Sequence, residues 1–196
     1  MQVRYRGTLV PSNRVFEVRA IDLLADLKMI WSWWNASHVQ GHWSIRTRLE
    51  PYRTAGLSYR PTDLAAYLTA LSQSDQTLAS IGCIDGVDIG YIETYRIGSS
   101  PLASHPELAP DDRGFHALIG DTNYTGSGLG PQMASQLVRW QFGQYPQALR
   151  VILEPNITNA PAIKAATKVS EARLAGQVEF SHKTAELIIF DRPPAI

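Results

Sequence analysis

Residues 124–131 read Tyr-Thr-Gly-Ser-Gly-Leu-Gly-Pro, with three glycines at alternate positions. Glycine lets the backbone approach a ligand closely and adopt dihedral angles that other residues avoid. Pro131 suits the first turn of a helix, so we expect a helix from this residue to about Gln144. The unpaired N–H groups and the dipole at the start of that helix would meet the glycine turn, which predicts a site for a phosphate or pyrophosphate. Taken alone, the run is equally well interpreted as a flexible loop before a helix.

Two common nucleotide-binding loops do not account for this run. A Walker A loop would continue with Gly-Lys-Ser or Gly-Lys-Thr, and this sequence contains neither after the glycines. A dinucleotide-binding loop would normally follow the first strand of a βαβ unit. Here two preceding strands, at 77–84 and 87–95, are joined by Asp85-Gly86, a dipeptide typical of a tight hairpin turn. The hairpin therefore excludes a doubly wound dinucleotide fold.

The pattern of apolar residues on either side of the run predicts the other elements. Asp22 suits the N-cap of a helix over 23–34, and Pro61 opens a second helix. Further helices are expected at 131–144 and 160–169, and strands at 15–21, 77–84, 87–95, 114–121, 150–153, 173–180 and 184–191. Residues 1–14 form an N-terminal extension or an extra strand. This order predicts a single α/β (α+β) domain over residues 1–196, with a mixed sheet of about six to seven strands flanked by about four helices.

The composition excludes several classes of protein. Eighteen basic residues balance eighteen acidic ones, which argues against nucleic acid as a partner. Cys83 is the sole cysteine, so an intramolecular disulfide is impossible, and its apolar neighbours predict a buried structural thiol. No apolar run reaches membrane-spanning length, and the N-terminus lacks the apolar core of a signal peptide. We therefore expect a soluble, cytoplasmic protein without a membrane partner.

Around the glycine run the predicted order is strand, glycine turn, helix, strand and helix, and the second of these strands ends in Glu154-Pro155-Asn156-Ile157-Thr158-Asn159. This order resembles the GNAT superfamily of N-acetyltransferases. The family loop reads Arg/Gln-x-x-Gly-x-Gly/Ala, and its backbone N–H groups hold the pyrophosphate of coenzyme A. This chain has Thr125 at the first position, so a side-chain contact there is in doubt while the backbone cradle remains. Asn159 matches an asparagine near the pantetheine arm, although it also suits a helix N-cap. The resemblance implies acetyl-CoA or another acyl-CoA, held by Thr125, Gly126, Ser127, Gly128, Leu129, Gly130 and Asn159.

Three further motifs narrow the resemblance. Asn35-x-x-His38-Val39 with a following Trp43, then residues 90–95, then Gly114-Phe115-His116, are similar to the branch that makes hydroxamate siderophores. Members of that branch acylate the hydroxylated side-chain amine of lysine, ornithine or a related diamine. Aminoglycoside 6'-N-acetyltransferases share much of the layout but place an aspartate where His116 stands, which favours the siderophore branch. The resemblance covers nearly the whole chain.

His116 supplies a general base in this interpretation. An amine that attacks a thioester must lose a proton, and a histidine with a pKa of about 6.5 can take it at neutral pH. Glu154 matches an acidic family position, where it would orient His116 or bind a charged part of the substrate. The resemblance also implies that a backbone N–H of the His116 strand stabilises the oxyanion. Cys83 is not placed as a nucleophile, so we expect direct transfer in a ternary complex.

A second group of residues is expected to bind the acceptor. Since side chains alternate along a strand, Glu93 and Tyr95 project from one side, where Glu93 would receive an amino group or form a structural ion pair. His182, in a predicted turn, is expected at the surface. Two histidines four residues apart lack a third ligand, so no metal is expected. The candidate acceptor-binding residues are Asn35, His38, Trp43, Glu93 and Tyr95.

Two alternatives to hydroxamate synthesis remain open at this point. The chain could acylate an unhydroxylated small amine, as aminoglycoside acetyltransferases do, or it could be a non-catalytic module that binds acyl-CoA. The absence of Arg or Gln at Thr125 favours the second alternative. The pattern leaves open the length of the acyl chain, the choice among lysine, ornithine and a diamine, and whether the protein is a monomer or a homodimer.

Overall fold

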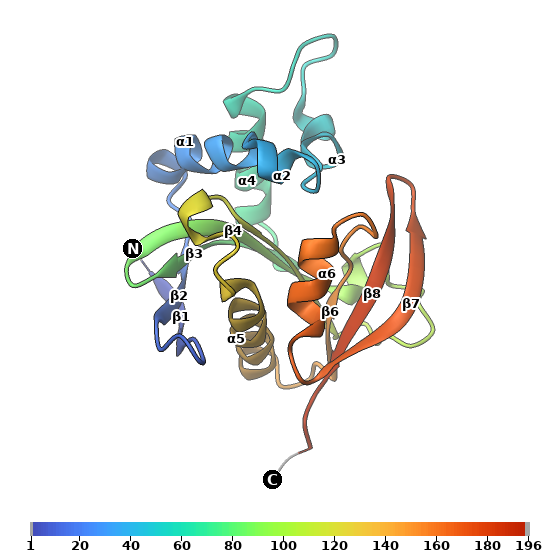
Figure 1. The fold of residues 1–196 in the computed structure, drawn as a ribbon. Coiled ribbons are helices and arrows are strands. Elements are labelled where there is room, and N and C mark those ends of the chain that lie inside the picture. Colours follow the sequence, from blue (N-terminus) through green and yellow to red (C-terminus); the bar gives the residue numbers. More distant parts are fainter. Residues whose placement is uncertain (1, 195–196) are drawn as a thin grey trace.

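The computed structural model describes residues 2–194 and contains one eight-stranded sheet (Figure 1). The strand order is β1-β2-β3-β4-β5-β6-β8-β7, and every neighbouring pair is antiparallel except β5 and β6. The mixed α/β fold class is confirmed, and the sheet has one strand more than the expected six to seven because residues 1–14 contribute β1. The strands are β1 Val3–Thr8, β2 Val15–Ala20, β3 Thr77–Ile84, β4 Val87–Arg96, β5 Arg113–Ile119, β6 Arg150–Leu153, β7 Ala172–Phe180 and β8 Lys183–Asp191.

Helices cover both faces of the sheet (Figure 1). One face packs against α1 to α4 through Tyr91 and Leu118, while the other packs against α5 and α6 through Ile92 and Phe115. This division follows from the alternation of side chains along β4 and β5. Among residues 2–194, no helix combines the length and apolar character that a membrane span needs. The helices are α1 Leu23–Trp34, α2 Ser37–Gln40, α3 Ile45–Leu49, α4 Pro61–Ser72, α5 Leu129–Gln144 and α6 Ala160–Thr167, with single 3-10 turns η1 Glu50–Tyr52, η2 Ile97–Ser99 and η3 Thr122–Tyr124.

The ends of two helices are set by local features of the sequence. The Asp22 carboxylate accepts hydrogen bonds from the N–H groups of Leu24 and Ala25, so it caps α1 as predicted. The start of α5 was predicted two residues too late. Gly128 takes a left-handed conformation (φ +76°) that serves as the N-cap, and the helix therefore begins at Leu129 rather than at Pro131.

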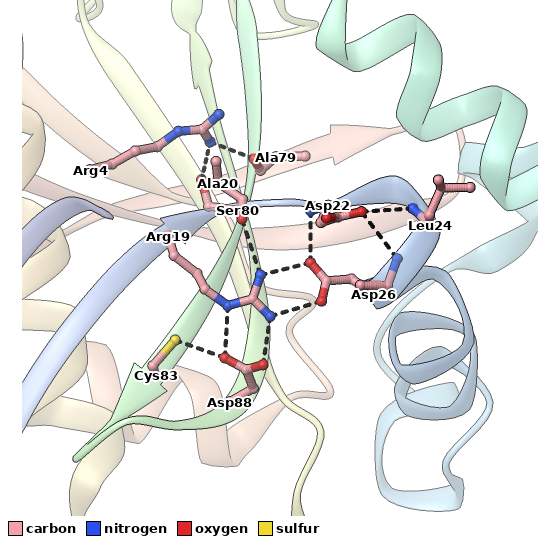
Figure 2. Close-up of polar contacts among 11 residues, drawn as sticks. Arg4, Arg19, Ala20, Asp22, Leu24, Asp26, Ala79, Ser80, Cys83 and Asp88 are labelled. Carbon is pink, nitrogen blue, oxygen red and sulfur yellow. Dashed lines mark hydrogen bonds and ion pairs between the residues drawn. The ribbon is translucent and has the colours of Figure 1, made fainter. Parts of the chain in front are cut away.

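A buried ion network ties α1 to the sheet (Figure 2). Arg19 on β2 is only 4% exposed, and its guanidinium donates to Asp26 on α1 at 2.7 and 2.9 Å and to Asp88 on β4. The Asp88 carboxylate also accepts a hydrogen bond from the Cys83 thiol. Burial and this hydrogen bond raise the pKa of Cys83 to about 12. The thiol is therefore protonated at neutral pH and takes part in structure, as the sequence predicted.

The sheet opens between its two parallel strands. β5 and β6 are joined at only two residue pairs, Arg113 with Val151 and Gly114 with Ile152. Beyond these pairs the strands separate. His116 lies two residues past Gly114, and Glu154 lies two residues past Ile152, so the period of a strand places both side chains on the same face of the opening. The candidate site is built around this opening.

Candidate active site

A cleft of about 1040 Å³ extends from the opening of the sheet. It is bounded by the glycine turn and the first residues of α5 on one side and by α6 on the other (Figure 1). The remaining walls come from β5 (Phe115 to Ile119), from the segment around α2 with Arg48 of α3, and from the β7–β8 turn. The cleft thus joins the predicted phosphate site to the predicted catalytic residues.

The glycine turn presents open backbone to the cleft. Gly126 and Gly128 have φ values of +69° and +76°, and a Cβ atom built at either position meets nothing within 4 Å. No side chain caps the start of α5, so its first N–H groups are left for a ligand. Gly130 instead allows α5 to pack closely against α6, since a Cβ atom there would lie 3.2 Å from Cβ of Ala165. The turn is suited to bind an anion through its backbone.

The hydroxyl side chains of the turn form hydrogen bonds within the turn itself. Thr125 donates to the carbonyl of Thr122 at 2.8 Å, and Ser127 donates to the carbonyl of Tyr124 at 2.9 Å. Thr125 lines the cleft with the glycines, whereas Ser127 does not. Asn159 lines the cleft and also caps α6, because its side chain accepts from the N–H of Ala162. Contacts to a ligand therefore fall mainly on backbone atoms.

His116 and Glu154 form a short polar contact in the cleft. Nε2 of His116 lies 2.5 Å from Oε1 of Glu154, as the resemblance implied. The imidazole is about one quarter exposed, while the carboxylate is almost fully buried. Nδ1 of His116 is enclosed, and among residues 2–194 it has no hydrogen-bond partner. In this arrangement Nε2 is engaged by Glu154 and Nδ1 is enclosed.

Glu93 is a second carboxylate behind the imidazole. Its Oε2 lies 3.7 Å from Nδ1 of His116, beyond hydrogen-bonding distance, and 3.3 Å from Nε of Arg48. Its Oε1 accepts hydrogen bonds from the hydroxyls of Tyr67 and Tyr91. Glu93 does not line the cleft, so the structure favours the ion-pair interpretation over direct contact with an amino group.

Electrostatics favour the charged forms of the His116–Glu154 pair. Burial works against the imidazolium, but the neighbouring Glu154 carboxylate outweighs it, so the pKa of His116 is raised. Burial likewise disfavours the carboxylates, yet His116 holds the pKa of Glu154 at about 2 and Arg48 with His116 holds that of Glu93 at about 2. The two groups of the pair titrate together.

The ring of Tyr95 supports the imidazole of His116. The two rings stack with centroids 4.9 Å apart, and Tyr95 itself lies outside the cleft wall. A Cβ atom at Gly114 would lie 2.3 Å from the Tyr95 ring, so glycine is required beneath this stack. The predicted role of Tyr95 in direct acceptor binding is therefore replaced by a supporting one.

The other predicted acceptor residues divide into two groups. His38 and Trp43 line the cleft, and Nε2 of His38 lies 2.9 Å from the carbonyl oxygen of Ile119. Trp43 is only 7% exposed and also packs in the core against Tyr91. Asn35 is not brought to the cleft; its amide donates to the carbonyl of Trp31 at the end of α1.

Several cationic residues of the cleft were not predicted. They are Arg48 on α3, Lys164 on α6, Lys168 after α6 and Lys183 at the start of β8. Nζ of Lys183 donates to the carbonyl oxygen of Glu154 at 2.5 Å, which holds the segment containing Glu154 against β8. His182 is exposed, as expected, but stands at the rim of the cleft. Within residues 2–194, no group of three potential metal ligands is gathered.

Comparison with known sequences gives one family and several distant relatives. Residues 22–180 match the family described as acetyltransferase (GNAT) domain. The lysine N-acyltransferase MbtK of Mycolicibacterium paratuberculosis is 26% identical over 170 residues, which cover 87% of this chain and 71% of that protein. The N-hydroxyputrescine acetyltransferase of Acinetobacter baumannii is 24% identical, covering 88% and 76%. An aminoglycoside N(6')-acetyltransferase of Klebsiella pneumoniae is 28% identical, covering 76% and 70%.

Comparison with solved structures supports the fold. An uncharacterised protein from Bacillus halodurans superposes with a TM-score of 0.81 at 23% identity, covering 95% of this chain and 89% of that one. The aminoglycoside acetyltransferase AAC(6')-Ib, solved with acetyl-CoA, has a TM-score of 0.74 at 24% identity, covering 90% and 93%. At such identities the likeness establishes the architecture alone.

Proposed function

Because this chain belongs to the GNAT acetyltransferase family, we propose that it moves an acyl group, acetyl in the simplest case, from acyl-CoA to a hydroxylated amine during hydroxamate siderophore synthesis. The chain is an acyl-CoA-dependent N-acyltransferase by family. The hydroxylated acceptor and the roles of individual residues are the proposal. The observation that carries it is the His116–Glu154 pair at the opening of the sheet, in the cleft that begins at the glycine turn.

The glycine turn and α5 are assigned to the pyrophosphate of acyl-CoA. The left-handed Gly126 and Gly128 turn the backbone so that N–H groups at the start of α5 face a ligand, where the helix dipole favours negative charge. The acyl arm would then run along β5 toward His116. Thr125, whose hydroxyl is bound within the turn, adds no charge to this site.

The proposed reaction is direct transfer. The acceptor nitrogen attacks the thioester carbonyl, so an N–C bond forms and the carbonyl electron pair moves to oxygen. The nitrogen gives its proton to the His116–Glu154 pair, and collapse of the intermediate breaks the C–S bond and releases the coenzyme A thiolate. His116 holds the transferred proton, and the Glu154 carboxylate stabilises the resulting imidazolium.

One chemical argument and one relative support a hydroxylated acceptor over a plain amine. Hydroxylation lowers the basicity of an amine, so the nucleophile is already neutral and needs no strong base. One relative is named for an N-hydroxylated diamine, N-hydroxyputrescine. Measurement of coenzyme A release with matched pairs of hydroxylated and plain amines tests this directly; higher kcat/KM for the plain member of each pair would contradict it.

Acylation of an unhydroxylated amine is the second candidate. The relative from Klebsiella pneumoniae, named as an aminoglycoside N(6')-acetyltransferase, is the observation in its favour. The same matched pairs decide between the two candidates.

Replacing Gly128 with leucine is expected to raise the KM for acyl-CoA by about tenfold. The new side chain projects into the open space before α5, and leucine disfavours the left-handed conformation that orients the N–H groups. Steady-state kinetics measure the change. Gly176→Leu is the control, because Gly176 has φ +90° with open space around it but lies outside the cleft. An unchanged KM for Gly128→Leu would remove the turn from the binding site.

The pH dependence of kcat/KM should identify the proton acceptor. Activity is expected to rise with pH as His116 loses its proton, with a midpoint above about 6.5, because Glu154 favours the imidazolium. In Glu154→Gln the midpoint should move to lower pH, since the carboxylate that holds the proton on His116 is gone. Ionisation of the acceptor is common to both enzymes, so the displacement reports the protein. Identical midpoints would contradict the pairing.

A further inference from the structure

We propose that Arg48 binds a carboxylate carried by one of the two reactants and thereby selects substrates. The inference rests on the proposed function, because it places the carboxylate beside the same reacting centre. Arg48 was not predicted from the sequence, and neither the phosphate site nor the proton transfer uses it. It nevertheless lines the cleft.

The guanidinium of Arg48 is held in a fixed orientation. Its Cζ lies 4.0 Å from the centroid of the Trp43 ring, so the planar group rests on the aromatic face. Its Nε contacts Glu93 at 3.3 Å. The side chain is 16% exposed, which means that most of its stem and one edge are packed. A group fixed in this way loses little freedom when it binds a ligand.

The two terminal nitrogens of Arg48 remain available. Among residues 2–194, neither nitrogen forms a hydrogen bond. Both are also absent from the fully enclosed polar atoms of this part of the chain, so they reach solvent. They are therefore the accessible part of a residue on the cleft wall. A guanidinium fork with two free parallel donors matches the two oxygens of a carboxylate.

The carboxylates beside Arg48 do not occupy this fork. Glu93 contacts Arg48 only at Nε and also accepts from two tyrosine hydroxyls, and Glu154 contacts His116. Lys183, a further cation that lines the same cleft, donates to the carbonyl oxygen of Glu154. The two terminal nitrogens of Arg48 are therefore the donors that this wall offers to an incoming anion.

The geometry also limits where the carboxylate of the ligand lies. One oxygen of Glu93 contacts Nε of Arg48 and lies 3.7 Å from Nδ1 of His116. The free fork is thus separated from the proton acceptor by little more than one carboxylate group. A carboxylate bound there would lie close to the proposed proton acceptor.

Two reactants can supply that carboxylate. It is either the α-carboxylate of a hydroxylated amino acid or the terminal carboxylate of a dicarboxylic acyl group on coenzyme A. Both present the same anion to Arg48. The experiment therefore varies the acceptor and the donor separately.

The first measurement uses the wild-type enzyme. Lysine, cadaverine, N6-hydroxylysine and N-hydroxycadaverine are compared as acceptors with acetyl-CoA, and the two cadaverines are compared again with succinyl-CoA. We expect kcat/KM to be higher by at least about tenfold for the carboxylated reactant, either in the comparison of acceptors or in the comparison of acyl donors. Absence of a preference in both comparisons would overturn the inference. The effect of N-hydroxylation, read from the same set, tests the proposed function independently of the carboxylate.

The second measurement uses Arg48→Lys and Arg48→Gln. Lysine keeps the charge beside Glu93 but lacks the fork, so KM for the carboxylated reactant should rise about tenfold while kcat/KM for its uncharged counterpart stays within about twofold. Glutamine should abolish the preference. Arg53→Gln is the control, because Arg53 pairs with Glu50 outside the cleft. Equal losses for carboxylated and uncharged reactants would show that Arg48 acts only through Glu93 and would overturn the proposal.

Discussion

Replacing His116 with alanine is expected to lower kcat by at least about tenfold, while the Kd for acyl-CoA changes by less than about twofold. The reason is that a positioned proton acceptor typically contributes roughly 10²–10⁴-fold, and part of that is dispensable when the acceptor amine is weakly basic. In the proposed mechanism His116 receives the transferred proton, whereas acyl-CoA is held by the glycine turn elsewhere in the cleft. Pre-steady-state turnover and calorimetry with acetyl-CoA measure the two quantities.

The control for this experiment is His105→Ala. His105 lies in the loop between β4 and β5, outside the cleft, and donates no contact to the catalytic pair. It should leave both kcat and Kd unchanged. Retained acyl-CoA binding by His116→Ala shows that the variant is folded, so unchanged turnover would remove His116 from the mechanism.

Replacing Arg19 with methionine is expected to lower the free energy of unfolding by about 3–5 kcal/mol. Arg19 is 4% exposed, and its removal leaves Asp26 buried without its cation. For a chain of this length, the loss corresponds to a decrease in Tm of roughly 6–20 °C. Thermal and urea unfolding followed by circular dichroism measure it.

A matched control is available on the neighbouring strand. Arg6 forms a salt bridge with Glu17 at 3.6 Å, but its side chain is 68% exposed. Arg6→Met should cost less than about 1 kcal/mol, because exposed ion pairs are screened by water and salt. Comparable losses in the two variants would mean that the buried network in Figure 2 does not have the expected stabilising role.

The sequence predicted the elements whose signals are local. The Asp85-Gly86 turn has positive φ at both residues, as a tight hairpin requires, and every predicted strand boundary lies within two residues of the observed one. The glycine run and the helix after it were also local signals. The pairing of His116 with Glu154 was inferred from family resemblance, since 38 residues separate them.

Other parts of the site depend on contacts between distant segments. α3 has five residues, too few to show a helical period, so nothing marked Arg48 as part of the cleft. The role of Glu93 is decided by Tyr67, which comes from α4 on the other side of the core. Lys183 follows a turn, and its place beside Glu154 depends on the pairing of β8 with β6.

The two residues of the proposed proton acceptor come from two parts of the sheet, which join through only two residue pairs between β5 and β6. His116 belongs to the part formed by β1 to β5, and Glu154 follows β6, whose ladder continues into β8 and β7. Apolar side chains from both parts share one core, but the ladder between them is short. Proton affinity at the reacting centre is therefore linked to docking of the two parts. A small separation of the strands would leave an ordinary imidazole on one side and an isolated carboxylate on the other.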